Sequence, residues 1–143
     1  MARSLSRHVQ PKVRLYSMET GRHLAISHRR IGSTRKSNSV LAEIEMISVS
    51  GSEFIIKGSQ TGLFIQAANR KLKLTGNKEQ ATLFSEELIE SNQFNKYKIS
   101  QSDNCFLTMR KNGKPKISCT KNVGNISFLP RKVHRQNNRG QHL

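Results

Sequence analysis

The sequence is poor in acidic residues, has no tryptophan and contains no long hydrophobic run. Only nine of its 143 residues are Asp or Glu, Asp103 being the only aspartate, whereas 25 are Lys or Arg. The adjacent residues Glu86 and Glu87 fall on a predicted strand, where neighbouring side chains point to opposite faces, so they do not form a catalytic carboxylate pair. No stretch reaches the ~18 apolar residues of a membrane-spanning helix, so membrane insertion is not expected.

Metal ligands and nucleophiles are equally sparse. The five histidines are scattered, without a metal-ligand spacing to either cysteine, and the sequence has no glycine-rich phosphate loop. His23 occupies the position that Phe64 and Phe106 hold in the repeat described below, which favours a packing role. We therefore expect neither an enzyme nor a bound metal or cofactor.

The two cysteines, Cys105 and Cys119, leave the redox compartment open. They flank a predicted hairpin whose turn contains Asn112-Gly113. If a two-residue turn forms there, residue 106 faces residue 119, and Cys105 points to the other side of the sheet. Free thiols are therefore the favoured interpretation, because a bridge would require a different register.

The positive charge is concentrated at the two ends of the chain. Residues 1–36 carry nine Lys or Arg against Glu19 alone, and residues 101–143 carry nine against Asp103 alone. Residues 37–100 carry seven of each sign and are neutral overall. A basic binding face would therefore need a fold that brings the two ends together.

An internal repeat supplies such a fold. The segments LYSMETGRHLAI, IKGSQTGLFIQA and KISQSDNCFLTM start at residues 15, 56 and 98, and each passes from an extended stretch through a small polar turn into a second extended stretch. A basic turn follows each segment, and then a closing strand: AEIEMI, ATLFSEEL or NISFLP. Alternation of Ile44 and Met46 with Glu43 and Glu45 is typical of a half-buried strand.

Three four-stranded units of about 42 residues are compatible with two all-β architectures. A three-bladed propeller falls below the usual four to eight blades. A β-trefoil, in which the three units close into one barrel, leaves no barrel edge unpaired and fits better. It would also place the first and last strands side by side, so that both basic ends meet on one face. The phenylalanines 64, 84, 106 and 128 fall at equivalent apolar positions and are expected in the core.

The stretch TGLFIQAANRKLKLTGNKEQATLFSEELIESNQFNKYKI, with the later FLTMRKNGKPK and SFLPR, resembles the core of a fibroblast growth factor. The resemblance covers roughly residues 13–133, leaving basic tails at 1–12 and 134–143 that are expected to be flexible. It implies a secreted, mitogenic β-trefoil ligand that binds and activates the extracellular domain of a receptor tyrosine kinase. It also implies heparan sulfate, carried by proteoglycans, as a co-ligand.

The receptor-binding residues that the resemblance implies form a largely apolar strip: Tyr16, Glu87, Asn92, Phe94 and Leu129. Phe94 replaces the tyrosine usual in the family, and Arg131 stands where some members extend the strip with an apolar residue. A competing interpretation places Tyr16 and Phe94 in the core or at its rim.

The heparin-binding residues implied by the resemblance surround the basic turn: Arg110, Lys111, Asn112, Lys114, Lys116 and Lys121. Glu19 replaces an asparagine that the family often supplies, and Ser118 replaces a glycine. We therefore expect a site of altered shape that relies more on Arg22, Arg29 and Arg30. Asn125 begins an N-glycosylation sequon beside this region.

Two other functions are compatible with parts of the sequence. Nucleic-acid binding would suit the net charge of +16, but stacking of bases needs exposed aromatic rings, and the phenylalanines read as core. Some intracellular relatives in the family bind ion-channel tails without activating the receptor, and they tend to carry an apolar residue in place of Asn95. The opening MARSLSRHVQPK has no apolar signal-peptide core. We expect a secreted monomer, with dimerisation on heparan sulfate left open.

Overall fold

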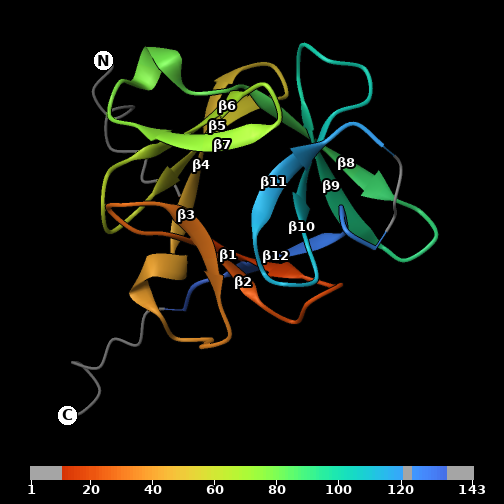
Figure 1. Cartoon of the computed structure of the whole chain (residues 1–143), viewed down its shortest axis with the longest axis horizontal. Helices are drawn as coiled ribbons and strands as arrows, with labels where there is room; N and C mark the ends of the chain where they lie inside the picture. Colours follow the sequence, from red (N-terminus) through yellow and green to blue (C-terminus); the bar gives the residue numbers. More distant parts are fainter. Residues whose placement is uncertain (1–10, 121–123, 135–143) are drawn as a thin grey trace, which may run out of the picture.

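The computed structural model describes residues 11–120 and 124–134. Within them the chain forms twelve strands and two short 3₁₀ turns, and no helix there is long and apolar enough to span a membrane (Figure 1). The strands are β1 (Lys12–Ser17), β2 (His23–Ile26), β3 (Ile31–Thr34), β4 (Ile44–Ser50), β5 (Glu53–Gly58), β6 (Phe64–Ala68), β7 (Lys71–Thr75), β8 (Phe84–Ile89), β9 (Phe94–Ile99), β10 (Phe106–Met109), β11 (Pro115–Ser118) and β12 (Phe128–Lys132). The 3₁₀ turns are η2 (Val40–Ala42) and η3 (Lys78–Gln80).

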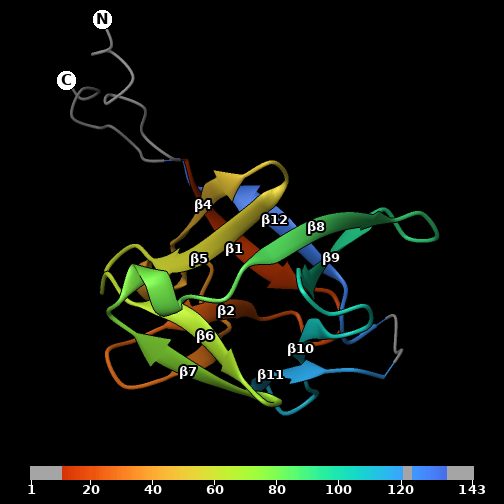
Figure 2. The same ribbon diagram turned by 90° about the horizontal axis from the view of Figure 1, so that it is seen from above.

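Six strands close into a barrel. Strand β1 pairs with β4, β4 with β5, β5 with β8, β8 with β9, β9 with β12, and β12 again with β1, all antiparallel. The hairpins β2–β3, β6–β7 and β10–β11 branch from β1, β5 and β9 and lie together at one end of the barrel (Figure 2). The predicted β-trefoil of three four-stranded units is therefore confirmed.

Each of the three repeated units contributes apolar residues at equivalent positions to one core. Leu15, Ile56 and Tyr97 occupy equivalent positions on β1, β5 and β9, and all three are fully buried. The expected core phenylalanines Phe64, Phe84, Phe106 and Phe128 are buried as well, and so is His23, which confirms its packing role. Equivalent apolar residues converge on one axis because each unit contributes one third of the same barrel interior.

The β1–β12 ladder joins the two ends of the described chain. It pairs Val13 with Lys132 and Tyr16 with Leu129, so the first and last strands are neighbours, as expected. The same register sets Arg14 opposite Arg131 on the outer face. The expected tails lie almost entirely outside the described residues.

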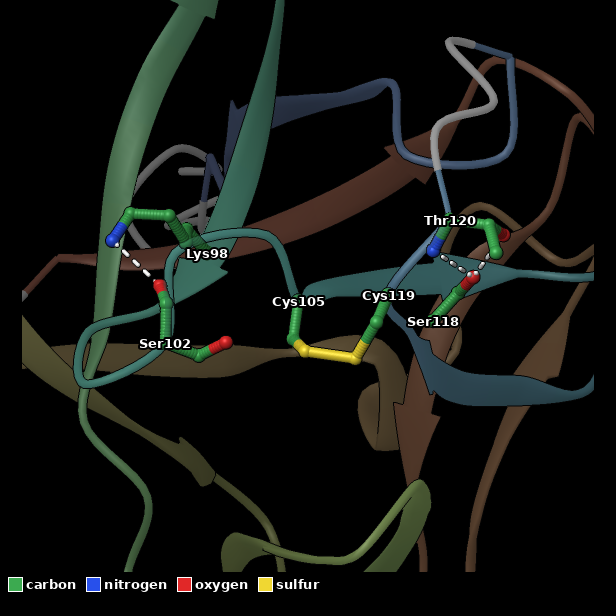
Figure 3. The surroundings of a disulfide bond; sticks show 6 residues. All are labelled: Lys98, Ser102, Cys105, Ser118, Cys119 and Thr120. Carbon is green, nitrogen blue, oxygen red and sulfur yellow. Dashed lines mark hydrogen bonds between the residues drawn. A yellow bond between two sulfur atoms is a disulfide. The ribbon is translucent and has the colours of Figure 1, made fainter.

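The interpretation of Cys105 and Cys119 as free thiols is wrong, because they form a disulfide (Figure 3). The ladder pairs Phe106 with Ser118 and Met109 with Pro115, so the connecting turn spans residues 110–114. The same register continued by one residue sets Cys105 opposite Cys119, with Cα atoms 4.0 Å apart. A two-residue type I′ turn needs positive φ at both central residues, but only Gly113 of the Asn112-Gly113 pair has one.

Candidate ligand-binding surfaces

The basic turn between β10 and β11 is held by its own backbone. The Gly113 N–H donates to the Arg110 carbonyl at 2.7 Å, and the Arg110 N–H donates to the Lys114 carbonyl at 3.0 Å. Asn112 Oδ1 accepts the Lys114 N–H at 3.0 Å. Arg110, Lys111, Asn112 and Lys114 are all exposed, so a well-ordered turn presents three cations to solvent.

The basic turn also docks on the β2–β3 hairpin. Ser33 Oγ donates to the Gly113 carbonyl at 2.6 Å, across 80 residues of sequence. Gly113 is buried, and a Cβ atom there would lie 2.8 Å from Ser33 Oγ and 3.0 Å from Arg22 Nη1. Glycine is required at this point both for its φ of +85° and for this close approach. The contact brings Arg22, from the N-terminal unit, to the C-terminal cations.

Two open depressions flank the basic turn. One, of about 500 Å³, is lined by Glu19, Arg110, Lys111, Asn112 and Asn125. The other, of about 450 Å³, lies on the β2–β3 side, and its polar lining includes Arg22, Arg30, Asn112 and Lys114. Asn112 borders both. The structure thus places Arg110 and Lys111 at one hollow and Arg22, Arg30 and Lys114 at the other.

Some predicted residues lie apart from these hollows. Lys116 is half-buried on β11, opposite Thr108, and lines neither of the two depressions. Lys121 lies outside the described residues. Asn125 is half-buried, its carbonyl accepts the Met109 N–H at 3.1 Å, and the sequon residue Ser127 is fully buried. Glycosylation of Asn125 stays a prediction.

The predicted apolar strip crosses three neighbouring strands. Tyr16 on β1 lies directly opposite Leu129 on β12, and Leu129 is 38% exposed. Strand β12 pairs with β9 at Phe128 and Asn95, and this register continued by one residue places Leu129 opposite Phe94. Residues opposite one another in a ladder share a face. Tyr16, Leu129 and Phe94 therefore form one row, in which both rings are half-buried.

Asn92 fixes the end of this row. Its Oδ1 accepts the Phe94 N–H at 2.9 Å, and its Nδ2 donates to Ser127 Oγ at 3.1 Å and to Met18 Sδ at 3.5 Å. The amide thus ties the β8–β9 turn to the start of β12 and to the β1–β2 turn. Asn92 positions Phe94 as well as lying beside it.

Glu87 lies on the same face of the β8–β9 ladder as Phe94. It is exposed, and its carboxylate lies 3.7 Å from Lys96 Nζ. Directly opposite Phe94 is Ile89, which packs in a small buried cluster with Phe106 and Ile126. Ile89 therefore joins this cluster to the Phe94 end of the strip.

The outer face of β1 and β12 is strongly basic beyond Tyr16. Arg14 forms an ion pair with Glu43 at 3.3 Å, whereas Arg131 is exposed and has no ion-pair partner among the described residues. His23 is 4% exposed, and its ring centroid lies 5.6 Å from that of Tyr16. Burial lowers the pKa of His23 below 6.5, and the nearby charges of Arg131 and Arg14 lower it further.

We expect the free energy of unfolding to fall as the pH decreases below about 6.5, because His23 is held neutral in the fold and takes up a proton on unfolding. The variant His23→Phe should lack this contribution, and phenylalanine already fills the equivalent positions 64 and 106. Urea unfolding of both proteins at neutral and mildly acidic pH measures the difference. Equal pH slopes for the two proteins would contradict the assignment.

Sequence reasoning missed three contributors to these surfaces. Ser33 docks the basic turn, Met18 contacts Asn92, and Ser127 receives the Asn92 amide. None has a local signal, because each contact joins segments at least 35 residues apart.

Comparisons with known proteins agree with the fold and with the resemblance. The family model described as fibroblast growth factor matches residues 11–128. A Danio rerio protein described as a fibroblast growth factor 1 is 28% identical over 138 residues, covering 94% of this chain and 93% of the zebrafish protein. Human and mouse fibroblast growth factor 17 are each 27% identical over 120 residues, covering 81% of this chain. The matched region spans 55% of the length of those two proteins.

Proposed function

This chain belongs to the fibroblast growth factor family, and we propose that it is a secreted ligand that binds and activates a receptor tyrosine kinase ectodomain, with heparan sulfate as co-ligand. The family consists of signalling ligands and not of enzymes, and it uses no enzymatic cofactor. The described residues contain no group of three or more His, Cys, Asp or Glu side chains that could hold a metal ion.

The observation that carries the receptor proposal is the row formed by Tyr16, Leu129 and Phe94. These residues are far apart in sequence but adjacent across β1, β12 and β9. Two half-buried rings beside a 38% exposed leucine offer apolar area that a partner can bury. Glu87 and Lys96 supply the polar rim expected around such a contact.

The co-ligand proposal is supported by the cations gathered around the basic turn. Arg22, Arg30, Arg110, Lys111 and Lys114 come from three segments and face two adjoining hollows. Fixed cations bind a polyanion through charge pairing and counterion release. Nucleic acid is the less suitable polyanion, because the four phenylalanines of the repeat are buried and offer no stacking platform.

Heparin chromatography tests the co-ligand proposal. An arranged site is expected to hold the protein on immobilised heparin to clearly higher salt than on a cation exchanger of equal charge density, because sulfate groups then meet fixed cations. Release at the same salt from both supports would mean that only bulk charge binds. In that case the co-ligand proposal would be wrong.

A further inference from the structure

The two depressions beside the basic turn differ in charge, although they are similar in size. Among the described residues, the hollow on the Asn125 side is lined by two cations, Arg110 and Lys111, together with the carboxylate of Glu19. The hollow on the β2–β3 side contains three cations, Arg22, Arg30 and Lys114, and no acidic side chain among the described residues that line it. A sulfate group is repelled by a carboxylate, so the β2–β3 hollow is electrostatically the better one.

The backbone that carries the cations of the β2–β3 hollow is fixed by hydrogen bonds within the protein. Arg22 packs against Gly113, and its Nε atom is buried without a hydrogen-bond partner among the described residues. The β2–β3 turn that carries Arg30 is fixed by Ser27, whose Oγ accepts the Arg29 and Arg30 N–H groups at 3.2 and 3.1 Å. The backbone N–H of Lys114 is bound by Asn112 Oδ1 at 3.0 Å.

Arginines favour an oxyanion ligand. A guanidinium presents a planar fork of N–H donors that can contact two oxygens of one sulfate, whereas a lysine offers a single point charge. The β2–β3 hollow is lined by two arginines from different turns, Arg22 and Arg30. The hollow on the Asn125 side holds one arginine.

We propose that the sulfated polysaccharide lies mainly in the β2–β3 hollow, against Arg22, Arg30 and Lys114, and not against Arg110 and Lys111. This inference rests on the proposed heparan sulfate function and states where on this chain the sugar binds. Glu19 acts as the residue that excludes sulfate from the hollow on the Asn125 side.

Charge-matched variants test this location. Arg30→Gln and Lys111→Gln each remove one positive charge, so both should shift release from a cation exchanger equally. On a heparin oligosaccharide, Arg30→Gln is expected to raise Kd about tenfold through loss of a charge-assisted contact, and Lys111→Gln less than about twofold. Glu19→Gln is expected to lower Kd, because it removes the repulsion. Lys78→Gln is the control and is expected to lose no more affinity than its shift on the cation exchanger, since Lys78 is exposed on η3 and lines neither hollow.

The possible results distinguish where the sugar binds from whether the protein has an arranged sugar-binding site. A larger or equal loss for Lys111→Gln would overturn the location and leave sugar binding intact. No loss from either variant beyond that seen on the cation exchanger would overturn both the location and the arranged sugar site. Equal thermal midpoints for Lys78→Gln, Arg30→Gln and Lys111→Gln would show that altered folding does not cause the difference.

Discussion

Replacing both Cys105 and Cys119 by serine is expected to lower the free energy of unfolding by about 3 kcal/mol, the size typical for a closed loop of about 15 residues. The bridge joins residues 14 apart and sits at the base of the β10–β11 hairpin, whose tip is the basic turn. Removing it gives the unfolded chain more conformations and so favours unfolding. Urea denaturation of the double variant against wild type measures the loss.

Reduction of the wild-type protein supplies the matched control for the disulfide. A reducing agent should bring the unfolding midpoint of the wild type close to that of the double variant and should leave the double variant unchanged. A double variant within about 1 kcal/mol of the oxidised wild type would show that the bridge does not constrain the chain as proposed.

Shortening the side chains of Asn92 and Phe94 in the apolar strip is expected to cause a large loss of receptor affinity. The double variant Asn92→Ala with Phe94→Ala should weaken binding to a fibroblast growth factor receptor ectodomain by at least about 30-fold, as for a buried interface hot spot. The ring of Phe94 would be lost as apolar contact area. The Asn92 amide that holds the Phe94 N–H at 2.9 Å would be lost with it. Titration of the immobilised ectodomain measures the change.

An exposed apolar side chain outside the strip provides the control for that variant. Val40 on η2 is 50% exposed, and Val40→Ala should leave receptor affinity at the wild-type value. The strip variant should also keep wild-type release from heparin, because the basic turn is fixed independently by Ser33. Unchanged receptor affinity in the strip variant, with the fold intact, would refute the docking surface.

The fold was predictable from the sequence because its signal is repeated three times. Three similar segments begin at residues 15, 56 and 98, and a closed barrel built from three equal units is the structure that buries their apolar residues. The family resemblance then predicted which residues of this barrel form the apolar strip. Tyr16, Leu129 and Phe94 form a row because β1 pairs with β12 and β12 pairs with β9. The three-fold repeat predicts that these strands are neighbours.

The features that sequence reasoning missed depend on turn geometry and long-range contacts. The Asn112-Gly113 pair indicated a two-residue turn, but the Gly113 carbonyl is bound by Ser33 and the turn opens to residues 110–114. That change moves the register and brings Cys119 opposite Cys105. The division of the cations into two hollows likewise follows from the docking of the turn on the β2–β3 hairpin, a contact that joins residues 80 positions apart.

Binding of the full chain to a fibroblast growth factor receptor ectodomain, with and without a heparin oligosaccharide, tests the central claim most directly. The proposed function predicts saturable binding that the oligosaccharide strengthens, because the strip and the basic hollows are formed by different residues of one protein. Absence of binding in both conditions would contradict the account.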